Sequence, residues 1–159
     1  MIIRPIDASD FIAAQKLLDD TFMSEGHTPA QHRSHLMDVA GRSLAPHTWT
    51  LVAADDRGLL GHVVMCRPPS PLVHLADRDD AEIRLLAIAP NARRCGIATA
   101  LMTACLDRAR HAGCHRAVLA TQAPMLAAQL LYTRLGFQRV PGCDQLWEGR
   151  QLLAYEFAL

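Results

Sequence analysis

The fold is decided by the stretch Glu82-Ile83-Arg84-Leu85-Leu86-Ala87-Ile88-Ala89-Pro90-Asn91-Ala92-Arg93-Arg94-Cys95-Gly96-Ile97-Ala98. Its first eight residues form a nearly continuous apolar run, which is typical of a strand buried on both faces. Pro90 ends this strand, and a basic turn over residues 91–96 follows. An apolar stripe then predicts a helix over residues 97–112, with Gly113 at the position of a C-terminal cap. The stretch is therefore a buried strand joined to a helix by a short basic turn.

This turn has the chemistry of an anion-binding site. The first N–H groups of a helix have no partner within it, and the helix dipole adds positive potential there. Gly96 lets a ligand approach the backbone, while Arg93 and Arg94 can add side-chain charge. The spacing matches neither G-x-x-x-x-G-K-[ST] nor G-x-G-x-x-G, so the common nucleotide-binding loops are excluded. We predict a phosphate-binding turn; the alternative is that Gly96 only permits close helix packing.

The elements on either side of this stretch complete an α/β fold. Residues 116–121 form a second buried strand, so residues 82–121 make a strand–helix–strand unit with a parallel strand pair. A hairpin is predicted over residues 48–66, a loop over 67–80 and a second crossover helix over 125–135. The remaining predicted strands are residues 2–6, 137–140 and 152–157. The pattern predicts one mixed α/β sheet with helices on both faces.

Two further helices are predicted near the start of the chain. Asp7, with Asp10 three residues later, can cap a helix that runs to about Met23. The expected apolar face of this helix is Ile12, Leu17, Leu18 and Phe22. Thr28 suits the N-cap of the second helix, with Pro29 and Gln31 as its first and third residues and Gly41 at its end.

Composition narrows the class of protein. The chain has 159 residues, of which 50% are hydrophobic and 20% charged, and we expect a single globular domain over residues 1–159. Sixteen basic residues balance sixteen acidic ones, and no apolar run approaches the roughly 20 residues that span a bilayer, so we expect neither a nucleic-acid nor a membrane partner. The five scattered cysteines and an opening that is no secretory signal predict a reduced, cytoplasmic protein.

Several landmarks occur together in the order seen in one known family. The signature Q/R-x-x-G-x-G/A is matched by Arg93-x-x-Gly96-x-Ala98. Further landmarks are Ile3-Arg4-Pro5-Ile6, Leu60-Gly61-His62-Val63-Val64, Leu85-Leu86-Ala87-Ile88 and Leu131-Tyr132-Thr133-Arg134-Leu135-Gly136-Phe137. On these residues the whole chain resembles the GCN5-related N-acetyltransferases (the GNAT family). The resemblance implies a mostly antiparallel sheet whose central parallel strands splay apart to hold acetyl-CoA.

The resemblance also implies a reaction. The acetyl group would pass directly from acetyl-CoA, the co-substrate, to a primary amine of an acceptor that we expect to be a small molecule, with no metal. Two alternatives stay open: an acyl-CoA-binding regulatory or sensor module without turnover, and an acetyltransferase of protein N-termini or lysines. A homodimer is compatible with the resemblance.

The resemblance assigns cofactor-binding roles residue by residue. The backbone of Leu86, Ala87 and Ile88 would pair with the pantetheine arm like an added strand. The turn that follows would hold the pyrophosphate through its N–H groups. The residues of this turn are Arg93, Arg94, Cys95, Gly96, Ile97, Ala98 and Thr99.

Two residues are candidate catalysts. Tyr132 aligns with the tyrosine that many family members use as a general acid toward the CoA thiolate; the alternative is a core tyrosine. Glu82 could remove a proton from the amine, which is mostly protonated at neutral pH, directly or through a water. The alternative for Glu82 is a strand residue paired with Arg84 or Arg67.

The chain departs from the family pattern at two positions. Cys95 replaces the usual Arg, Gln or Gly of the phosphate turn, where a thiol is either reactive or inert filler. Met125 occupies the position of an asparagine that contacts the cofactor in many members, so we expect it to pack against the pantetheine or the core. His32 and His35 share a helix face that would border the acceptor, and no ligand spacing supports a metal site.

Overall fold

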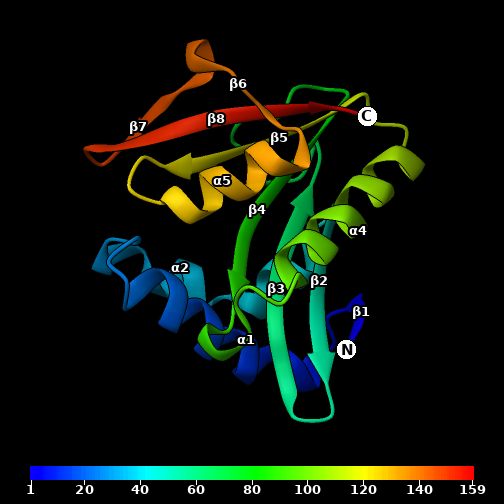
Figure 1. Cartoon of the computed structure of the whole chain (residues 1–159), viewed down its shortest axis with the longest axis vertical. Helices are drawn as coiled ribbons and strands as arrows, with labels where there is room; N and C mark the ends of the chain where they lie inside the picture. The colour runs from blue at the N-terminus through cyan, green and yellow to red at the C-terminus, as the bar shows by residue number, and fades with distance from the viewer.

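In the computed structural model, which describes residues 1–159, eight strands form one sheet (Figure 1). The strand order is β1-β2-β3-β4-β5-β8-β6, with β7 paired to β8, and every pair is antiparallel except β4 with β5. The strands are β1 (Ile2–Pro5), β2 (Thr48–Asp55), β3 (Gly58–Cys66), β4 (Asp80–Ile88), β5 (Arg116–Gln122), β6 (Gln138–Arg139), β7 (Gln145–Trp147) and β8 (Arg150–Ala158). The predicted mixed, mostly antiparallel sheet with a central parallel pair is confirmed.

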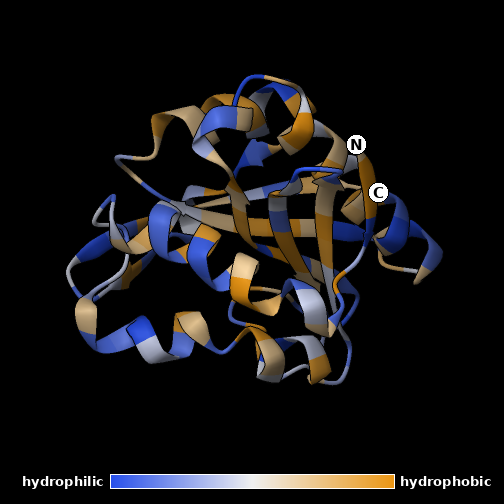
Figure 2. Ribbon diagram, turned by 90° about the horizontal axis from the view of Figure 1, so that it is seen from below, coloured by the Kyte–Doolittle hydropathy of each residue, from blue (hydrophilic) through white to orange (hydrophobic).

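The α-helices cover both faces of the sheet. They are α1 (Phe11–Leu18), α2 (Arg33–Met37), α3 (Val39–Leu44), α4 (Ile97–His111) and α5 (Leu126–Leu135). One hydrophobic cluster joins α4 to the sheet through buried residues such as Leu101 and Met102, and a second cluster packs Leu18 and Val39 of α1 and α3 on the other face. Figure 2 shows the hydrophobic residues concentrated on the central strands. No helix combines the length and the apolar character needed to cross a membrane.

The parallel strands β4 and β5 are joined at one end only. Their paired residues are Asp80–Arg116, Ala81–Ala117 and Glu82–Val118. Beyond these pairs β4 continues to Ile88 and β5 to Gln122 without further pairing to each other. The other edge of β5 stays paired with β8 over its whole length. The sheet therefore opens into a V between β4 and β5, which is visible in Figure 1.

Local sequence signals set several element ends as predicted. Asp7 and Asp10 form a capping box before α1. Asp7 Oδ1 accepts a hydrogen bond from Ser9 N at 2.8 Å, and Asp10 Oδ2 accepts one from Asp7 N at 2.9 Å. Gly113 and Gly136 follow the ends of α4 and α5 with φ of 76° and 97°, a backbone conformation that side chains disfavour.

The first helix differs from its prediction in two ways. The segment Asp19–Met23 continues α1 as a wider π turn. Ile12 is 82% exposed, so the expected apolar face holds for Leu17 and Leu18 but not for Ile12. Phe11 and Phe22, which are partly buried, pack against the cluster of Leu17 and Leu18.

The second predicted helix is wrong at both ends. Thr28 makes no cap, and Pro29 precedes a 3-10 turn over Ala30–His32 that leads into α2. Asp38 interrupts the helix with φ −76° and ψ 63°, and its side chain accepts a hydrogen bond from Gly41 N at 2.9 Å, which starts α3. Aspartate competes in this way with helical hydrogen bonding, so Gly41 lies inside a new helix rather than at the end of the old one.

Candidate active site

The turn between β4 and α4 presents a row of backbone N–H groups that are free to bind a ligand. The N–H groups of residues 93–96 donate to no backbone or side-chain acceptor of the chain. In α4 the first carbonyl used is that of Gly96, which accepts from Ala100 N at 3.0 Å, so the N–H groups of residues 97–99 are also without a helical partner. The positive end of the α4 dipole lies at the same place. The turn is therefore suited to an anionic group, as the sequence predicts.

Backbone geometry explains why this turn contains a glycine. Gly96 has φ 78° and Arg94 has φ 61°, so two residues of the turn adopt the left-handed conformation. A Cβ added to Gly96 would meet no protein atom within 4 Å. The left-handed dihedral angle of Gly96 therefore favours glycine at this position. Close helix packing does not explain the glycine, because the space around it is open.

The side chains of the turn differ in what they do. Arg93 Nη2 binds Glu25 Oε1 at 2.7 Å, and Arg93 Nε lies 3.4 Å from the carbonyl of Ile88. Arg94 is exposed and forms no ion pair, which leaves its charge available to a ligand. Cys95 is exposed, and its thiol contacts the carbonyl of Arg93 at 3.5 Å.

The edge of β4 that faces the V is open from Ile83 onward. On the opposite edge His62 is paired with Ala87, and Ala89 N donates to Leu60 O at 2.9 Å. Because successive residues direct their backbone groups to alternate edges, those of Leu86 and Ile88 face the V. Of the three predicted pantetheine-binding residues, Leu86 and Ile88 therefore have backbone groups that face the V. The backbone groups of Ala87 point to β3 instead.

Tyr132 lies on α5, in the cluster that α4 shares with the sheet. Its ring is 5.9 Å from the rings of both Phe137 and Tyr155, and the residue is only 7% exposed. Burial raises the pKa of the Tyr132 hydroxyl above its usual range, with a smaller contribution from Tyr155. The phenol is thus protonated at neutral pH, and no protein group hydrogen-bonds its oxygen. It is therefore a protonated phenol that packing holds in place.

Glu82 occupies a position that favours its structural alternative. Its Oε2 accepts hydrogen bonds from the backbone N–H groups of His74, Leu75 and Ala76, at 2.9, 2.7 and 3.1 Å. Its Oε1 lies 3.6 Å from Arg84 Nη1, and the side chain is 6% exposed. The carboxylate therefore anchors the loop before β4, with Arg84 as the neighbour that the sequence suggested.

A segment from Glu25 to His32 spans the opening of the V. On the β4 side, Glu25 binds Arg93. On the β5 side, Gln122 donates to the carbonyl of His27, and Arg150 Nη1 donates to the carbonyl of Gly26 at 2.7 Å. A group that reaches the open edge of β4 from this direction must pass the bridging segment.

The bridging segment also contacts the β7–β8 hairpin. His32 Nε2 lies 2.9 Å from Glu148 Oε1, and the His32 ring is 5.2 Å from that of Trp147. Glu25, Gln122, Glu148 and Arg150 carry no sequence signal, because their partners lie 68 to 124 residues away. His35 does not join this group, and no three His, Cys, Asp or Glu side chains come together as metal ligands.

Met125 lies directly before α5 and contacts the end of β5. It is half-buried at the start of α5, and its sulfur accepts a hydrogen bond from the Thr121 hydroxyl at 3.7 Å. It therefore joins the end of β5 to α5.

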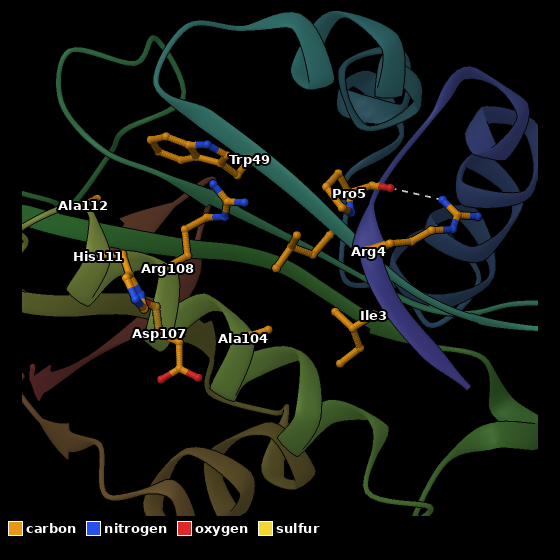
Figure 3. A pocket seen from close by; sticks show the side chains of 10 residues that line it. Ile3, Arg4, Pro5, Trp49, Ala104, Asp107, Arg108, His111 and Ala112 are labelled. Atoms are coloured by element: carbon orange, nitrogen blue, oxygen red, sulfur yellow. Dashed lines mark hydrogen bonds between the residues drawn. The ribbon is translucent and has the colours of Figure 1, made fainter.

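A hollow of about 610 Å³ lies elsewhere on the surface, between the C-terminal half of α4 and strands β1 and β2 (Figure 3). Its walls include Ile3 and Trp49, and Arg108 stacks over the Trp49 ring at 5.5 Å. The hollow begins at Ala104, whereas the free N–H groups lie before residue 100 at the other end of the helix. It is separate from the turn over residues 93–96.

These features are a sheet that opens between two parallel strands and a row of free N–H groups at the mouth of the opening. The family model described as "Acetyltransferase (GNAT) family" matches residues 12–137. The chain therefore belongs to the GNAT acetyltransferase family. No curated protein sequence matches it.

Solved structures share the fold at low identity. A ribosomal-protein-alanine N-acetyltransferase from Brucella melitensis aligns with a TM-score of 0.71 and 20% identity over 100% of both chains. A GNAT-family acetyltransferase from Staphylococcus aureus Mu50 gives a TM-score of 0.80 and 14% identity, over 99% of this chain and 98% of that one. A GCN5-related N-acetyltransferase from Kribbella flavida gives a TM-score of 0.76 and 24% identity, over 99% of this chain and 97% of that one.

Proposed function

We propose that the chain is a single-domain, acetyl-CoA-dependent N-acetyltransferase that transfers the acetyl group directly to a primary amine of a small molecule. The observation that carries this proposal is the row of free N–H groups over residues 93–99, which continues from the open edge of β4. The free N–H groups would form a phosphate site, and the unpaired edge of β4 leads up to it along the chain. A pyrophosphate attached to an amide-containing pantetheine arm has the matching chemistry.

The cofactor contacts follow from which groups are free. The pyrophosphate would bind the N–H groups of residues 93–99, with Arg94 rather than the ion-paired Arg93 as the available cation. The pantetheine amides would pair with Leu86 and Ile88 like an added strand, while Ala87 remains paired with β3. The thioester would then lie deeper in the V, toward the point where β4 and β5 still pair.

The reaction removes two protons from the amine and delivers one to the CoA thiolate. The neutral amine nitrogen attacks the thioester carbonyl carbon, the carbon–nitrogen bond forms and the carbon–sulfur bond breaks. Tyr132 donates its proton to the departing thiolate of CoA and regains one from solvent. The amine loses one proton before attack and one as the amide forms, and we assign both to water, because Glu82 already accepts three backbone hydrogen bonds.

The acceptor would enter beside the bridging segment, Glu25–His32. Short contacts from this segment to Arg93, Gln122 and Glu148 line the approach with both charged and neutral polar groups. Such a passage does not select a peptide over a small amine. Two similar structures are named ribosomal-protein-alanine N-acetyltransferases, so a peptide with an N-terminal alanine belongs among the acceptors tested.

The test is CoA release from acetyl-CoA, followed with a thiol reagent. The acceptors are polyamines, amino acids, aminoglycosides and short peptides with free N-termini, each compared with an acceptor-free blank. A protein-only blank corrects for the five cysteines. Acceptor-dependent release is expected. Acetyl-CoA binding without release for any acceptor would favour a sensor module, and absence of acetyl-CoA binding would contradict the proposal outright.

A further inference from the structure

His62 is the one histidine that is fully buried in the sheet. It lies on β3 with 0% exposure, on the face that α1 and α3 cover, between Val52 of β2 and Ala87 of β4. Its Nδ1 lies 3.0 Å from the carbonyl oxygen of Leu85, and its Nε2 has no partner. A carbonyl can only accept, so Nδ1 carries the hydrogen. A protonated ring would bury a second N–H at Nε2 without any acceptor, so the imidazole is neutral.

The residue that His62 contacts belongs to a β-bulge. In the β3–β4 register His62 faces Ala87 and Val64 faces Arg84. One residue of β3, Val63, thus stands opposite two residues of β4, Leu85 and Leu86. The extra residue is unpaired by the ladder, and Leu85 has φ 52°. A branched side chain in the left-handed region is strained, so neighbouring contacts must hold it there.

The bulge lies where β4 separates from β5. The last parallel pair is Glu82–Val118, and the bulge follows three residues later. An extra residue shifts the alternation of every residue beyond it. The bulge therefore sets which backbone groups of β4 face the V, and these are the groups of Leu86 and Ile88.

We propose that His62 is a positioning residue for the acetyl-CoA site, and that its Nδ1–H holds the Leu85 carbonyl so that the bulge aims Leu86 and Ile88 into the V. The inference rests on the proposed function, since it concerns the same ligand. His62 does not touch acetyl-CoA in this account. Without its hydrogen bond the Leu85 carbonyl would lose its only side-chain partner, and the bulge would be free to shift its register.

Three variants test the inference, and acetyl-CoA affinity is measured by calorimetry together with KM and kcat. His62→Leu removes the Nδ1–H donor and replaces the imidazole with a side chain of similar volume. His62→Asn keeps an N–H donor near the position of Nδ1. Val52→Ala is the matched control, because Val52 is fully buried and pairs with His62 but lies on β2, which is not a neighbour of β4 in the sheet.

The expected results separate positioning from packing. The loss of one buried hydrogen bond corresponds to about tenfold weaker acetyl-CoA binding for His62→Leu. The acetyl-CoA Kd of His62→Asn is expected to stay within about threefold of the native value. Val52→Ala is expected to lower Tm with its acetyl-CoA Kd unchanged. If the Leu variant does not fold, His62→Gln replaces it, because its amide nitrogen corresponds to Nε2 and not to Nδ1.

Two outcomes would overturn the inference: native affinity in a folded variant that lacks a donor at the position of Nδ1, or an equal loss of affinity in Val52→Ala. Native protein that binds no acetyl-CoA at all would contradict the proposed function instead. The two failures are therefore distinguishable by the wild-type measurement.

Discussion

Arg116 of β5 binds Asp80 of β4 through two parallel hydrogen bonds, Nε to Oδ1 at 3.0 Å and Nη2 to Oδ2 at 2.8 Å. Its third nitrogen, Nη1, binds Glu156 of β8 at 2.7 Å. The Asp80 and Glu156 carboxylates hold the pKa of Arg116 above its usual value, Asp80 most strongly. One guanidinium thus joins three strands at the closed end of the V, and this end fixes how far β4 and β5 can separate.

Asp80→Asn is expected to destabilise the fold. The Asp80 side chain is 6% exposed and that of Arg116 39%, so the change weakens partly buried, charge-assisted hydrogen bonds and leaves Arg116 without its bidentate partner. We expect the free energy of unfolding to fall by about 2–3 kcal/mol, measured by urea denaturation. Asp79→Asn, an exposed neighbour, is the control and should change little. Equal stability of the two variants would show that the Arg116–Asp80 pair does not support the closed end.

Gly96→Ala is expected to abolish acetyl-CoA binding while the protein stays folded. The new Cβ meets no protein atom, and we expect it to occupy space that the bound pyrophosphate needs. Gly113→Ala is a matched control, because Gly113 has φ 76°, also with nothing within 4 Å, at the far end of α4. Both variants should lose about 1 kcal/mol of stability from backbone strain, and only Gly96→Ala should lose affinity by calorimetry. Retained affinity would place the pyrophosphate elsewhere.

Tyr132→Phe is expected to lower kcat by about a hundredfold without changing the Kd of acetyl-CoA, since only a proton donor is removed. Tyr155→Phe controls for the loss of a hydroxyl in the same aromatic cluster, with its ring 5.9 Å from that of Tyr132. The comparison uses steady-state kinetics with the best acceptor of the panel. Turnover that is unaffected in Tyr132→Phe would leave Tyr132 as a core residue only.

Stability is expected to decline as the pH falls from about 6.5 to about 4. Burial lowers the pKa of His62 to about 4, and the charge of Arg42 acts in the same direction. An unfolded histidine binds its proton near pH 6.5, so in this interval the unfolded chain gains a proton that the folded chain does not. Urea denaturation at several pH values should show a shallower decline for His62→Asn than for the native protein. The same slope in both would mean that His62 titrates normally in the fold.

What could be predicted from the sequence was local in the chain. The turn at Gly96 and the cap at Gly113 depend on dihedral angles that a few neighbouring residues set, and both were predicted correctly. The break at Asp38 was missed because an aspartate inside a helical pattern can either face solvent or start a new turn. β7 was missed because three residues are too few to show an alternating pattern.

The contacts that shape the site were beyond sequence reasoning for a different reason. The side chain of Arg93 pairs with Glu25, which is 68 residues away, and no local pattern indicates such a partner. The bulge at Leu85 was hidden inside an apolar run in which every residue looks alike. Glu82 had two readings in the sequence, and only the folded loop shows that its Oε2 accepts three backbone N–H groups.

The most direct test of the account is an NMR titration of the ¹⁵N-labelled protein with acetyl-CoA, followed at the backbone amides. We predict the largest shifts at residues 93–99 and at Leu86 and Ile88, with little change around the hollow lined by Trp49 and Arg108. Gly96→Ala should abolish the shifts. Saturable shifts centred on the Trp49 hollow, with residues 93–99 unaffected, would contradict the placement of acetyl-CoA in the V between β4 and β5.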